Sequence, residues 1–204
     1  MTYRARVAAM ICVLALAPTV AWAEKTRFDT PTETTHRQIT WDDFKGRLTR
    51  TQVEQAQIST AIQTAPFEVK MTRLNKGFWV AAPLALEFYA AMSKVQSGAG
   101  KAARTDQLLA HEQGHFDLTE IMARRLGHKL VGVEAHGETS AQARAALIEK
   151  VERAHRVTVD ELNAWQAEYD RATHHGVHRR QQRQWTKKIN AWLSETVDPL
   201  HLLD

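Results

Sequence analysis

The sequence contains a single cysteine among its 204 residues, and this one, Cys12, lies in an apolar run near the N-terminus. Without that segment the chain has no thiol at all, which excludes disulfide bonds, a cysteine nucleophile and cysteine ligands for a metal. Its stability must then come from a hydrophobic core, which a metal held by other side chains can supplement. About 180 residues are enough for one domain with a sizeable core.

The chain also lacks a hydrophobic run long enough to cross a bilayer. The apolar stretch from Val7 to Val20 has 14 residues, whereas a membrane-spanning helix needs about 20. Arg4 and Arg6 precede this stretch and Ala21-Trp22-Ala23 follows it, an arrangement typical of a cleaved secretory signal peptide. We therefore expect residues 1–23 to be removed, and the mature protein to be secreted or periplasmic without a membrane span.

A large excess of charge of one sign is absent too. The full chain has a formal net charge of +4, and removal of Arg4 and Arg6 reduces it to +2. This balance gives little support for a nucleic-acid partner, and we expect none. The one local excess is a basic cluster formed by Arg179, Arg180, Arg183, Lys187 and Lys188. Such a cluster is more typical of the solvated face of an amphipathic helix than of a polyanion or membrane-surface site.

Two kinds of hydrophobic periodicity divide the chain. Residues 24–37 are polar and indicate a flexible lead-in. In residues 38–96, apolar and polar side chains alternate, as in Ala56 to Gln63, which predicts strands of an antiparallel sheet with one buried face. In residues 104–198, apolar residues recur at helical spacing, which predicts a bundle of about three helices. The expected fold class is α+β, with the sheet before the helices, in a single domain over residues 24–204.

The expected helices have recognisable ends. The first is expected from Arg104 to Leu130 and the third from Val177 to Leu193. The second is expected to begin near Thr139, because Thr139 and Gln142 have capping-box spacing, and to end near Gly176, a typical C-terminal cap.

The strongest helical segment carries His111-Glu112-Gln113-Gly114-His115. Histidines four residues apart lie on the same face of a helix, so both imidazoles can bind one Zn²⁺. Glu112 follows the first histidine, where its carboxylate can accept a proton from water at the metal and deliver it to a leaving amine. Gly114 costs about 1 kcal/mol relative to alanine inside a helix. Its lack of a side chain can let a substrate or a neighbouring element approach the ion, and the alternative is a mildly destabilised helix that nothing approaches. We therefore predict a zinc site with Glu112 as general base.

Two histidines do not complete a catalytic zinc site, which normally has three protein ligands and one open position. Glu134 and Glu138 follow downstream, and a second group lies in Tyr169-Asp170-Arg171-Ala172-Thr173-His174-His175-Gly176. This group gathers a carboxylate, two imidazoles and a phenol beside a chain reversal, which can direct side chains at another helix. It is the richer source of a third ligand.

At this point the chain resembles a known family, the bacterial domain-of-unknown-function family 922, which is described as predicted secreted zinc-dependent proteases. The resemblance rests on Trp41-Asp42-Asp43-Phe44-Lys45-Gly46, on Leu108 to Asp117, and on Tyr169-Asp170-x-x-Thr173-x-His175-Gly176 followed by glutamine-rich sequence and Trp185. These blocks span nearly the whole mature chain in the family's order. Ser93-Lys94-Val95 departs from the Ser-Trp-Val expected of the family.

The resemblance also implies roles for the residues around position 170. The family pattern places a histidine before the glycine, which favours His175 as the third zinc ligand. Asp170 is the alternative ligand, or else a partner that orients an imidazole. Tyr169 can donate to the oxyanion of a tetrahedral intermediate, and the alternative role for it is that of a core residue between packed elements.

Together these residues predict an exported zinc-dependent metallopeptidase of the HExxH type, with about one Zn²⁺ per chain and a peptide or protein substrate. Two alternatives stay open. One is a non-catalytic envelope protein that uses zinc to stabilise its fold or to bind a partner, and the other is a metal-dependent amidase acting on cell-wall peptides. Structural zinc usually has four protein ligands, so the number of side chains at the metal separates the first alternative from an enzyme.

Overall fold

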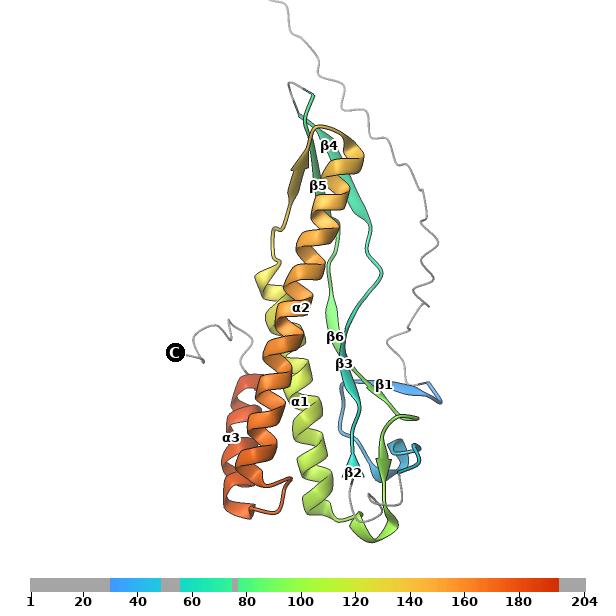
Figure 1. The fold of residues 1–204 in the computed structure, drawn as a ribbon, viewed down its shortest axis with the longest axis vertical. Coiled ribbons are helices and arrows are strands. Elements are labelled where there is room, and N and C mark those ends of the chain that lie inside the picture. The colour runs from blue at the N-terminus through green and yellow to red at the C-terminus, as the bar shows by residue number, and fades with distance from the viewer. Residues whose placement is uncertain (1–29, 49–55, 75–76, 195–204) are drawn as a thin grey trace, which may run out of the picture.

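The structure is a computed structural model, which describes residues 30–48, 56–74 and 77–194. The predicted signal peptide, residues 1–23, lies outside the described residues, as does the beginning of the lead-in. The described part is elongated, with helices along one side and strands along the other (Figure 1). The expected α+β class, with antiparallel strands before three α-helices, is confirmed. No described helix is both long enough and apolar enough to cross a membrane.

The strands form three small antiparallel sheets, where the sequence predicts a single sheet. In chain order they are β1 (Glu33–Thr35), β2 (Ala56–Gln57), β3 (Thr60–Thr64), β4 (Val69–Arg73), β5 (Trp79–Pro83), β6 (Phe88–Ser93), β7 (Gly98–Ala99) and β8 (Ala135–Gly137). The strand orders are β1-β6-β3, β2-β7 and β4-β5-β8. Most residues of β6 are buried, as expected of a central strand with a neighbour on each edge.

Three strands lie where the sequence analysis places none, and the shortest of them, β7, follows the expected strand region and pairs with β2. β1 falls within the expected lead-in, residues 24–37, and pairs with β6, and Thr34 at its centre is buried. β8 lies between the first two helices and pairs with β5. None of the three has more than three residues, which is too short an alternation to recognise by its period. Each is defined by a partner strand that is distant in the sequence.

The helical half agrees closely with the expected boundaries. The α-helices are α1 (Asp106–Lys129), α2 (Ser140–Thr173) and α3 (Arg179–Ser194). The predicted capping box is confirmed, because Thr139 Oγ1 accepts from the Gln142 backbone N–H at 3.2 Å and Gln142 Oε1 accepts from the Thr139 N–H at 3.1 Å. α2 ends ahead of Gly176, since His174 already adopts a left-handed conformation with φ 51°.

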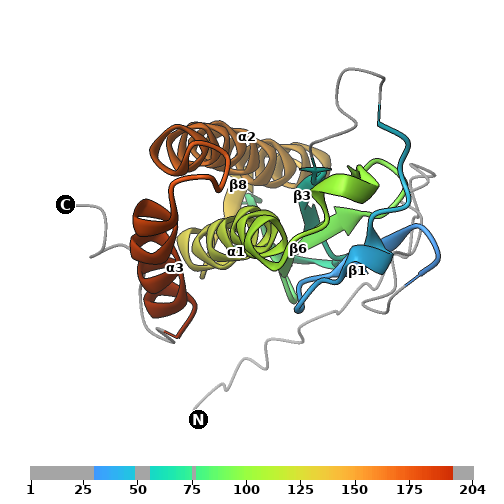
Figure 2. The same ribbon diagram turned by 90° about the horizontal axis from the view of Figure 1, so that it is seen from below.

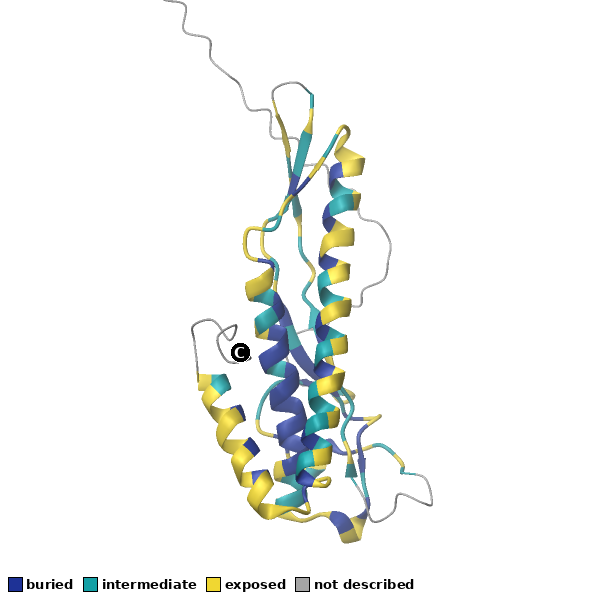
Figure 3. Cartoon of the chain, turned by 60° about the vertical axis from the view of Figure 1, so that its left-hand side comes forward, coloured by how far each residue is buried: buried dark blue, intermediate teal, exposed yellow. Residues whose placement is uncertain are grey.

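α1 is the central element of the fold. The helices α2 and α3 cover one side of it, and β3 and β6 cover the other (Figure 2). Figure 3 shows α1 buried over much of its length, whereas α2 and α3 expose their outer faces. The core between the helices includes Leu118, Leu126, Leu147, Leu162 and Ile189. Each fully buried aliphatic side chain contributes roughly 1.5–3 kcal/mol, and a polar side chain on α1 must find its partners inside the protein.

Residues 36–39 pass along α1 and are bound to it by Gln113, the third residue of the HExxH motif at positions 111–115. Gln113 Oε1 accepts from the Ile39 backbone N–H at 2.8 Å, and its Nε2 donates to the Arg37 carbonyl at 3.1 Å and to Asp117 Oδ1 at 2.7 Å. His36 Nε2 lies 2.8 Å from the same Asp117 oxygen. The N-terminal segment is therefore fixed to the helix that carries the motif.

Asp43, at the end of the 3-10 helix η1 (Trp41–Asp43), anchors this segment. Its buried carboxylate accepts from Arg37 Nη2 at 2.7 Å and Nη1 at 3.0 Å, and from the Thr40 backbone N–H at 2.9 Å. Lys94, which departs from the family's Ser-Trp-Val pattern, places its Nζ 3.7 Å from Asp43 Oδ1. Burial by itself raises the pKa of Asp43, but Arg37, with Thr40 and Lys94, brings that pKa below its ordinary value.

Asp43→Asn is expected to destabilise the fold in a pH-dependent manner. A carboxylate whose pKa is lowered by folding adds stability above its unfolded pKa of about 3.9, and this stability is lost as pH falls through the folded pKa. The variant should be less stable than wild type by about 2 kcal/mol at pH 7, and the two should converge in strong acid. Urea unfolding at a series of pH values measures this.

The exposed neighbour Asp42 provides the matched control for this prediction. Asp42→Asn makes the same chemical change without touching Arg37, and it should alter the free energy of unfolding by less than about 0.5 kcal/mol. Equal losses in the two variants would show that the buried carboxylate has no special contribution.

Candidate metal centre

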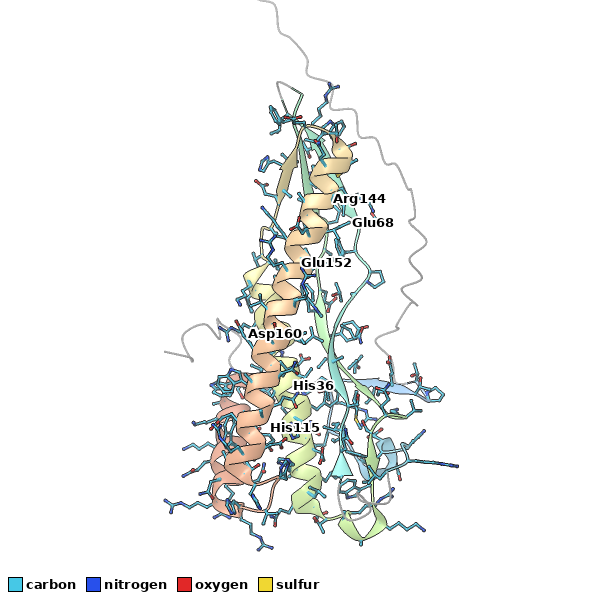
Figure 4. All side chains as sticks on the ribbon, in the orientation of Figure 1. His36, Glu68, His115, Arg144, Glu152 and Asp160 are labelled. Atoms are coloured by element: carbon cyan, nitrogen blue, oxygen red, sulfur yellow. The ribbon has the colours of Figure 1, made fainter. Side chains whose placement is uncertain are left out.

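The HExxH motif lies near the start of α1, where this helix meets the end of α2 and the beginning of α3. His111, Glu112 and His115 are only 2%, 4% and 7% exposed. Figure 4 shows His115 in the lower half of the molecule, at about the level of His36, with Arg144 toward the upper end of α2. Buried ionisable groups require hydrogen bonds or charges that compensate them, and here these come from α2 and α3.

Three ligand atoms converge at this place. His111 Nε2 and His115 Nε2 lie 3.2 Å apart, and Asp170 Oδ1 at the end of α2 lies 3.1 Å from the first and 2.9 Å from the second. Two ligands of a tetrahedral zinc ion, each about 2.0–2.1 Å from the metal, lie about 3.3 Å from one another. The triangle of the two imidazoles and the carboxylate therefore has nearly the dimensions of a zinc coordination sphere.

His175, which the sequence favours as the third ligand, lies at the edge of this triangle. Its Nδ1 is 3.5 Å from Asp170 Oδ1, and its side chain is 74% exposed. Ligand atoms of His111, Asp170 and His175 all lie within 4.8 Å of one another. The structure thus brings both predicted candidates to the site, with Asp170 in direct contact with the two histidines of the motif and His175 beyond it.

The other candidates, Glu134 and Glu138, do not reach the site. They flank β8, which lies with β5 in the half of the molecule away from β2 (Figure 1). Both are exposed, and Glu134 Oε1 contacts His136 at 3.3 Å. Neither glutamate is a ligand of a metal held by α1 and α2.

Hydrogen bonds behind His111 determine which of its ring nitrogens carries the proton. The Tyr169 hydroxyl lies 3.1 Å from the His111 carbonyl oxygen, to which it can only donate. The same hydroxyl oxygen accepts from Gln182 Nε2 at 2.6 Å. This orientation turns Gln182 Oε1 toward His111 Nδ1, 3.2 Å away, so Nδ1 is the donor. The Nε2 lone pair of a neutral His111 therefore faces Asp170.

The same arrangement is repeated behind His115. Thr119 Oγ1 donates to the His115 carbonyl at 2.9 Å and accepts from Gln166 Nε2 at 3.3 Å. Gln166 Oε1 then faces His115 Nδ1 at 2.6 Å. In both cases a hydroxyl bound to the histidine's own carbonyl orients a glutamine, and the glutamine orients the imidazole. The Nε2 lone pairs of both neutral rings are thereby directed at one point.

The chemistry of this donor set fits a zinc ion. Two Nε2 lone pairs and a carboxylate oxygen, all acceptors, lie within 3.2 Å of one another. A single proton can form a hydrogen bond between two of these atoms, but the third atom is then left without a donor. A divalent cation can bind all three atoms together. Imidazole and carboxylate are preferred zinc ligands, and metal-binding histidines normally donate their second ring N–H to an acceptor, as both do here.

The pKa shifts reflect the same contacts. Burial lowers the pKa of His111 and outweighs the opposing hydrogen bond to Asp170. Burial also lowers the pKa of His115, but the hydrogen bond and charge of Asp170 outweigh it and the net direction is upward. Burial raises the pKa of Asp170, but its hydrogen bonds to the two histidines bring it well below the ordinary range. Asp170 is therefore the anionic member of the set at neutral pH.

Glu112 lies beside the ligand atoms. Its carboxylate accepts a hydrogen bond from the backbone of Ile58, next to β2, and is close enough to His115 and Asp170 for their charges to act on it. Burial is the largest effect and raises the pKa of Glu112 to about 7. A near-neutral pKa suits a group that must both take up and release a proton.

Residues 89–176 match the model of a family described as "Bacterial protein of unknown function (DUF922)". Over this segment the chain is similar to DUF922. Comparison with curated proteins and with solved structures gives no match. The DUF922 segment contains α1, α2 and every candidate ligand, whereas η1 and α3 lie outside it. The family resemblance found in the sequence is thus confirmed for the blocks around the motif and around position 170.

Within the DUF922 segment, Tyr169 packs directly against the HExxH motif. Its side chain is fully buried, and its ring stacks on His111 with centroids 4.7 Å apart. A Cβ at Gly114 would lie 2.2 Å from the Tyr169 hydroxyl oxygen. Any larger residue at this position would therefore clash with Tyr169 of α2. Burial also raises the pKa of the Tyr169 hydroxyl. Its proposed contact with an oxyanion stays a prediction, since both of its hydrogen bonds here are to protein groups.

The DUF922 segment ends in a turn with an unusual backbone. His174 and His175 both have φ 51°, in the left-handed region that non-glycine residues seldom adopt, and Gly176 follows with φ 80°. A Cβ at Gly176 would lie 2.8 Å from the His111 Cβ, and Gln107 Nε2 donates to the Gly176 carbonyl at 2.6 Å. Each left-handed histidine costs about 1 kcal/mol or more. The turn is therefore held against His111 despite local strain.

Three residues that support the DUF922 site were missed by the sequence analysis: Thr119, Gln166 and Gln182. The sequence contains a signal for one of them, Gln166. Gln166, Asp170 and Thr173 are spaced i, i+4 and i+7, which places them on one face of α2. A polar face on a helix that packs against the HExxH motif is a reason to search it for groups that orient the ligands.

Gln166→Ala and Gln182→Ala are each expected to lower zinc affinity by about 10–100-fold, because the imidazole that each glutamine orients loses its acceptor. Competition with a chromophoric chelator measures the affinity. Gln184→Ala removes an exposed glutamine from the same helix as Gln182 and serves as the control. Unchanged affinity in both site variants would mean that the glutamines do not position the ligands.

Proposed function

We propose that the protein is an exported zinc-dependent metallopeptidase. The observation that carries the proposal is the convergence of His111 Nε2, His115 Nε2 and Asp170 Oδ1 within 3.2 Å of one another. The buried carboxylate of Glu112 is close enough to His115 and Asp170 for their charges to shift its pKa. Three protein ligands are the usual number in a catalytic zinc site, which keeps its fourth position open. In this proposal Asp170 takes the place of the third ligand, and residues 1–23 direct export.

The residues support peptide hydrolysis in distinct ways. A bound zinc ion supplies Lewis acidity and lowers the pKa of water to about 7. Glu112 accepts the proton of the attacking water and delivers it to the leaving nitrogen, and its pKa of about 7 suits both halves of the transfer. Asp170 offsets the positive charge at the site, and Gln166 and Gln182 hold the two imidazoles in place.

Glu112→Gln is expected to retain about one zinc per chain and to lower peptide hydrolysis by roughly 10²–10⁴-fold, because the amide keeps the shape of the side chain but cannot accept the proton. Zinc content and cleavage of a peptide library measure the two properties. The substrates should include peptidoglycan fragments, so that an amidase acting on cell-wall peptides is also detected.

A glutamate on the same helix provides the control for this variant. Glu120 pairs with Arg124 at 2.8 Å, away from the ligand atoms, and Glu120→Gln should leave hydrolysis unchanged. If Glu112→Gln cleaves as fast as wild type, Glu112 is not the general base.

A second candidate function is a non-catalytic protein whose zinc stabilises the fold. The observation that favours it is His175, whose Nδ1 lies 3.5 Å from Asp170 Oδ1 and which provides a fourth donor. With four protein ligands the site has no open position. Chelation should then lower the melting temperature strongly while no peptide is cleaved, whereas the peptidase requires that removing His175 leave hydrolysis intact.

A further inference from the structure

Positive charge is concentrated on α3. This helix carries five basic and no acidic residues. With residues 1–23 removed, the chain has a net charge of +2 from 25 basic and 23 acidic residues, so without the five of α3 the remainder is −3. The net charge is therefore close to zero because a strongly cationic helix is nearly balanced by the mildly acidic remainder of the chain.

Three cations of α3 lie on the face that is turned away from the core. Arg180, Arg183 and Lys187 are spaced i, i+3 and i+7, which places them along one face, and all three are exposed. The opposite face buries Trp185 and Ile189 against α1 and α2. Figure 3 shows α3 exposed along its outer side, with buried positions only where it meets the other helices. We call Arg180, Arg183 and Lys187 the basic stripe.

The basic stripe differs from two exposed arginines of α2. On α2, Arg153 and Arg156 each pair with a glutamate four residues earlier. In residues 30–48, 56–74 and 77–194, by contrast, no member of the basic stripe forms an ion pair. Their charges are therefore not neutralised by these residues, and they can attract an anionic partner outside the protein.

We propose that the basic stripe binds the phosphate headgroups of an anionic lipid surface. The helix α3 lies at the edge of the molecule (Figure 2), and the three exposed side chains of the stripe follow one face of it, a shape that suits a planar partner. Its aromatic neighbour Trp185 is buried and offers no surface on which nucleic-acid bases could stack. Juxtaposed lysines and arginines of this kind are attracted to anionic leaflets, and the predicted export would bring the protein beside a membrane.

Vesicle sedimentation tests the proposal, with phosphatidylcholine vesicles compared with vesicles containing about 30% phosphatidylglycerol. Wild type should bind only the anionic vesicles, and increasing salt should release it. Replacing Arg180, Arg183 and Lys187 together by glutamine should weaken binding about 100-fold, at roughly fivefold per cation. Replacing Lys150, Arg153 and Arg156 of α2 removes the same charge and should change binding by less than about threefold.

The other outcomes would overturn the proposal. These are no binding of wild type to anionic vesicles at low salt, equal losses in the two triple variants, or binding to double-stranded DNA or polyglutamate but not to vesicles. The glutamine variants lie on the solvent side, and circular dichroism and zinc content should confirm that they fold. Because Glu112→Gln should bind vesicles like wild type, failure of the lipid proposal is distinguishable from failure of the peptidase proposal.

Discussion

Gly114→Ala is expected to lower the free energy of unfolding by about 3 kcal/mol, although alanine is the better helix former by about 1 kcal/mol. The added methyl group would lie 2.2 Å from the Tyr169 hydroxyl oxygen and 2.7 Å from its Cζ. Tyr169 is fully buried and cannot move without breaking its hydrogen bonds to His111 and Gln182. Zinc affinity should therefore fall together with stability. Urea unfolding and chelator competition measure the two effects.

Gly127 provides a matched control on the same helix. A Cβ there would have Phe88 Cδ2 at 4.0 Å as its nearest neighbour, so Gly127→Ala should stabilise the fold by about 0.5–1 kcal/mol. Opposite signs for the same substitution on one helix would show that close packing at Gly114, and not helix propensity, determines the result. A stabilising Gly114→Ala would contradict the observed contact between α1 and α2.

Asp170→Ala is expected to weaken zinc binding by at least about 100-fold, whereas His175→Ala should weaken it by less than about tenfold. The Asp170 carboxylate lies 3.1 and 2.9 Å from the two Nε2 atoms of the motif, while His175 is largely exposed. Structural zinc sites with four ligands bind with about 10–16 kcal/mol, which implies about 3 kcal/mol or more for each ligand. Competition with a chelator ranks the two variants.

His174→Ala is the control for the ligand ranking. His174 has the same backbone conformation as His175, but its ring stacks on that of His178. Its removal should leave zinc affinity unchanged. If His175→Ala causes the larger loss and Asp170→Ala the smaller, the resemblance-based assignment of His175 is right and the carboxylate only orients an imidazole.

Much of the helical half could be predicted from the sequence because its signals are local. The cap at Thr139 and Gln142 requires residues three positions apart, and the periodicity of α1 is visible over 24 residues. The strands were harder to predict because each one is defined by pairing with a strand that is distant in the sequence. β8 exists because Ala135–Gly137 pairs with Trp79–Ala81 across the molecule, and no three-residue pattern contains that information.

The candidate site also has a part that local sequence predicts and a part that depends on how the helices pack. The two histidines and Glu112 follow from helical spacing, since one turn of one helix brings them together. Asp170 was recognised only as an alternative to His175, because ranking them requires the angle at which α2 meets α1. Gln166 and Gln182 act through hydrogen bonds that join three helices. Glutamine is common on helix surfaces, so its residue type alone gave no reason to single out these two.

A crystal structure of the zinc-loaded protein, with anomalous diffraction recorded at the zinc absorption edge, tests the central claim most directly. The expected result is one ion bound by His111 Nε2, His115 Nε2 and an Asp170 oxygen, with a water molecule in the fourth position and Glu112 within hydrogen-bonding distance of that water. An ion whose fourth position is filled by His175 would contradict the peptidase. So would an ion bound elsewhere in the chain.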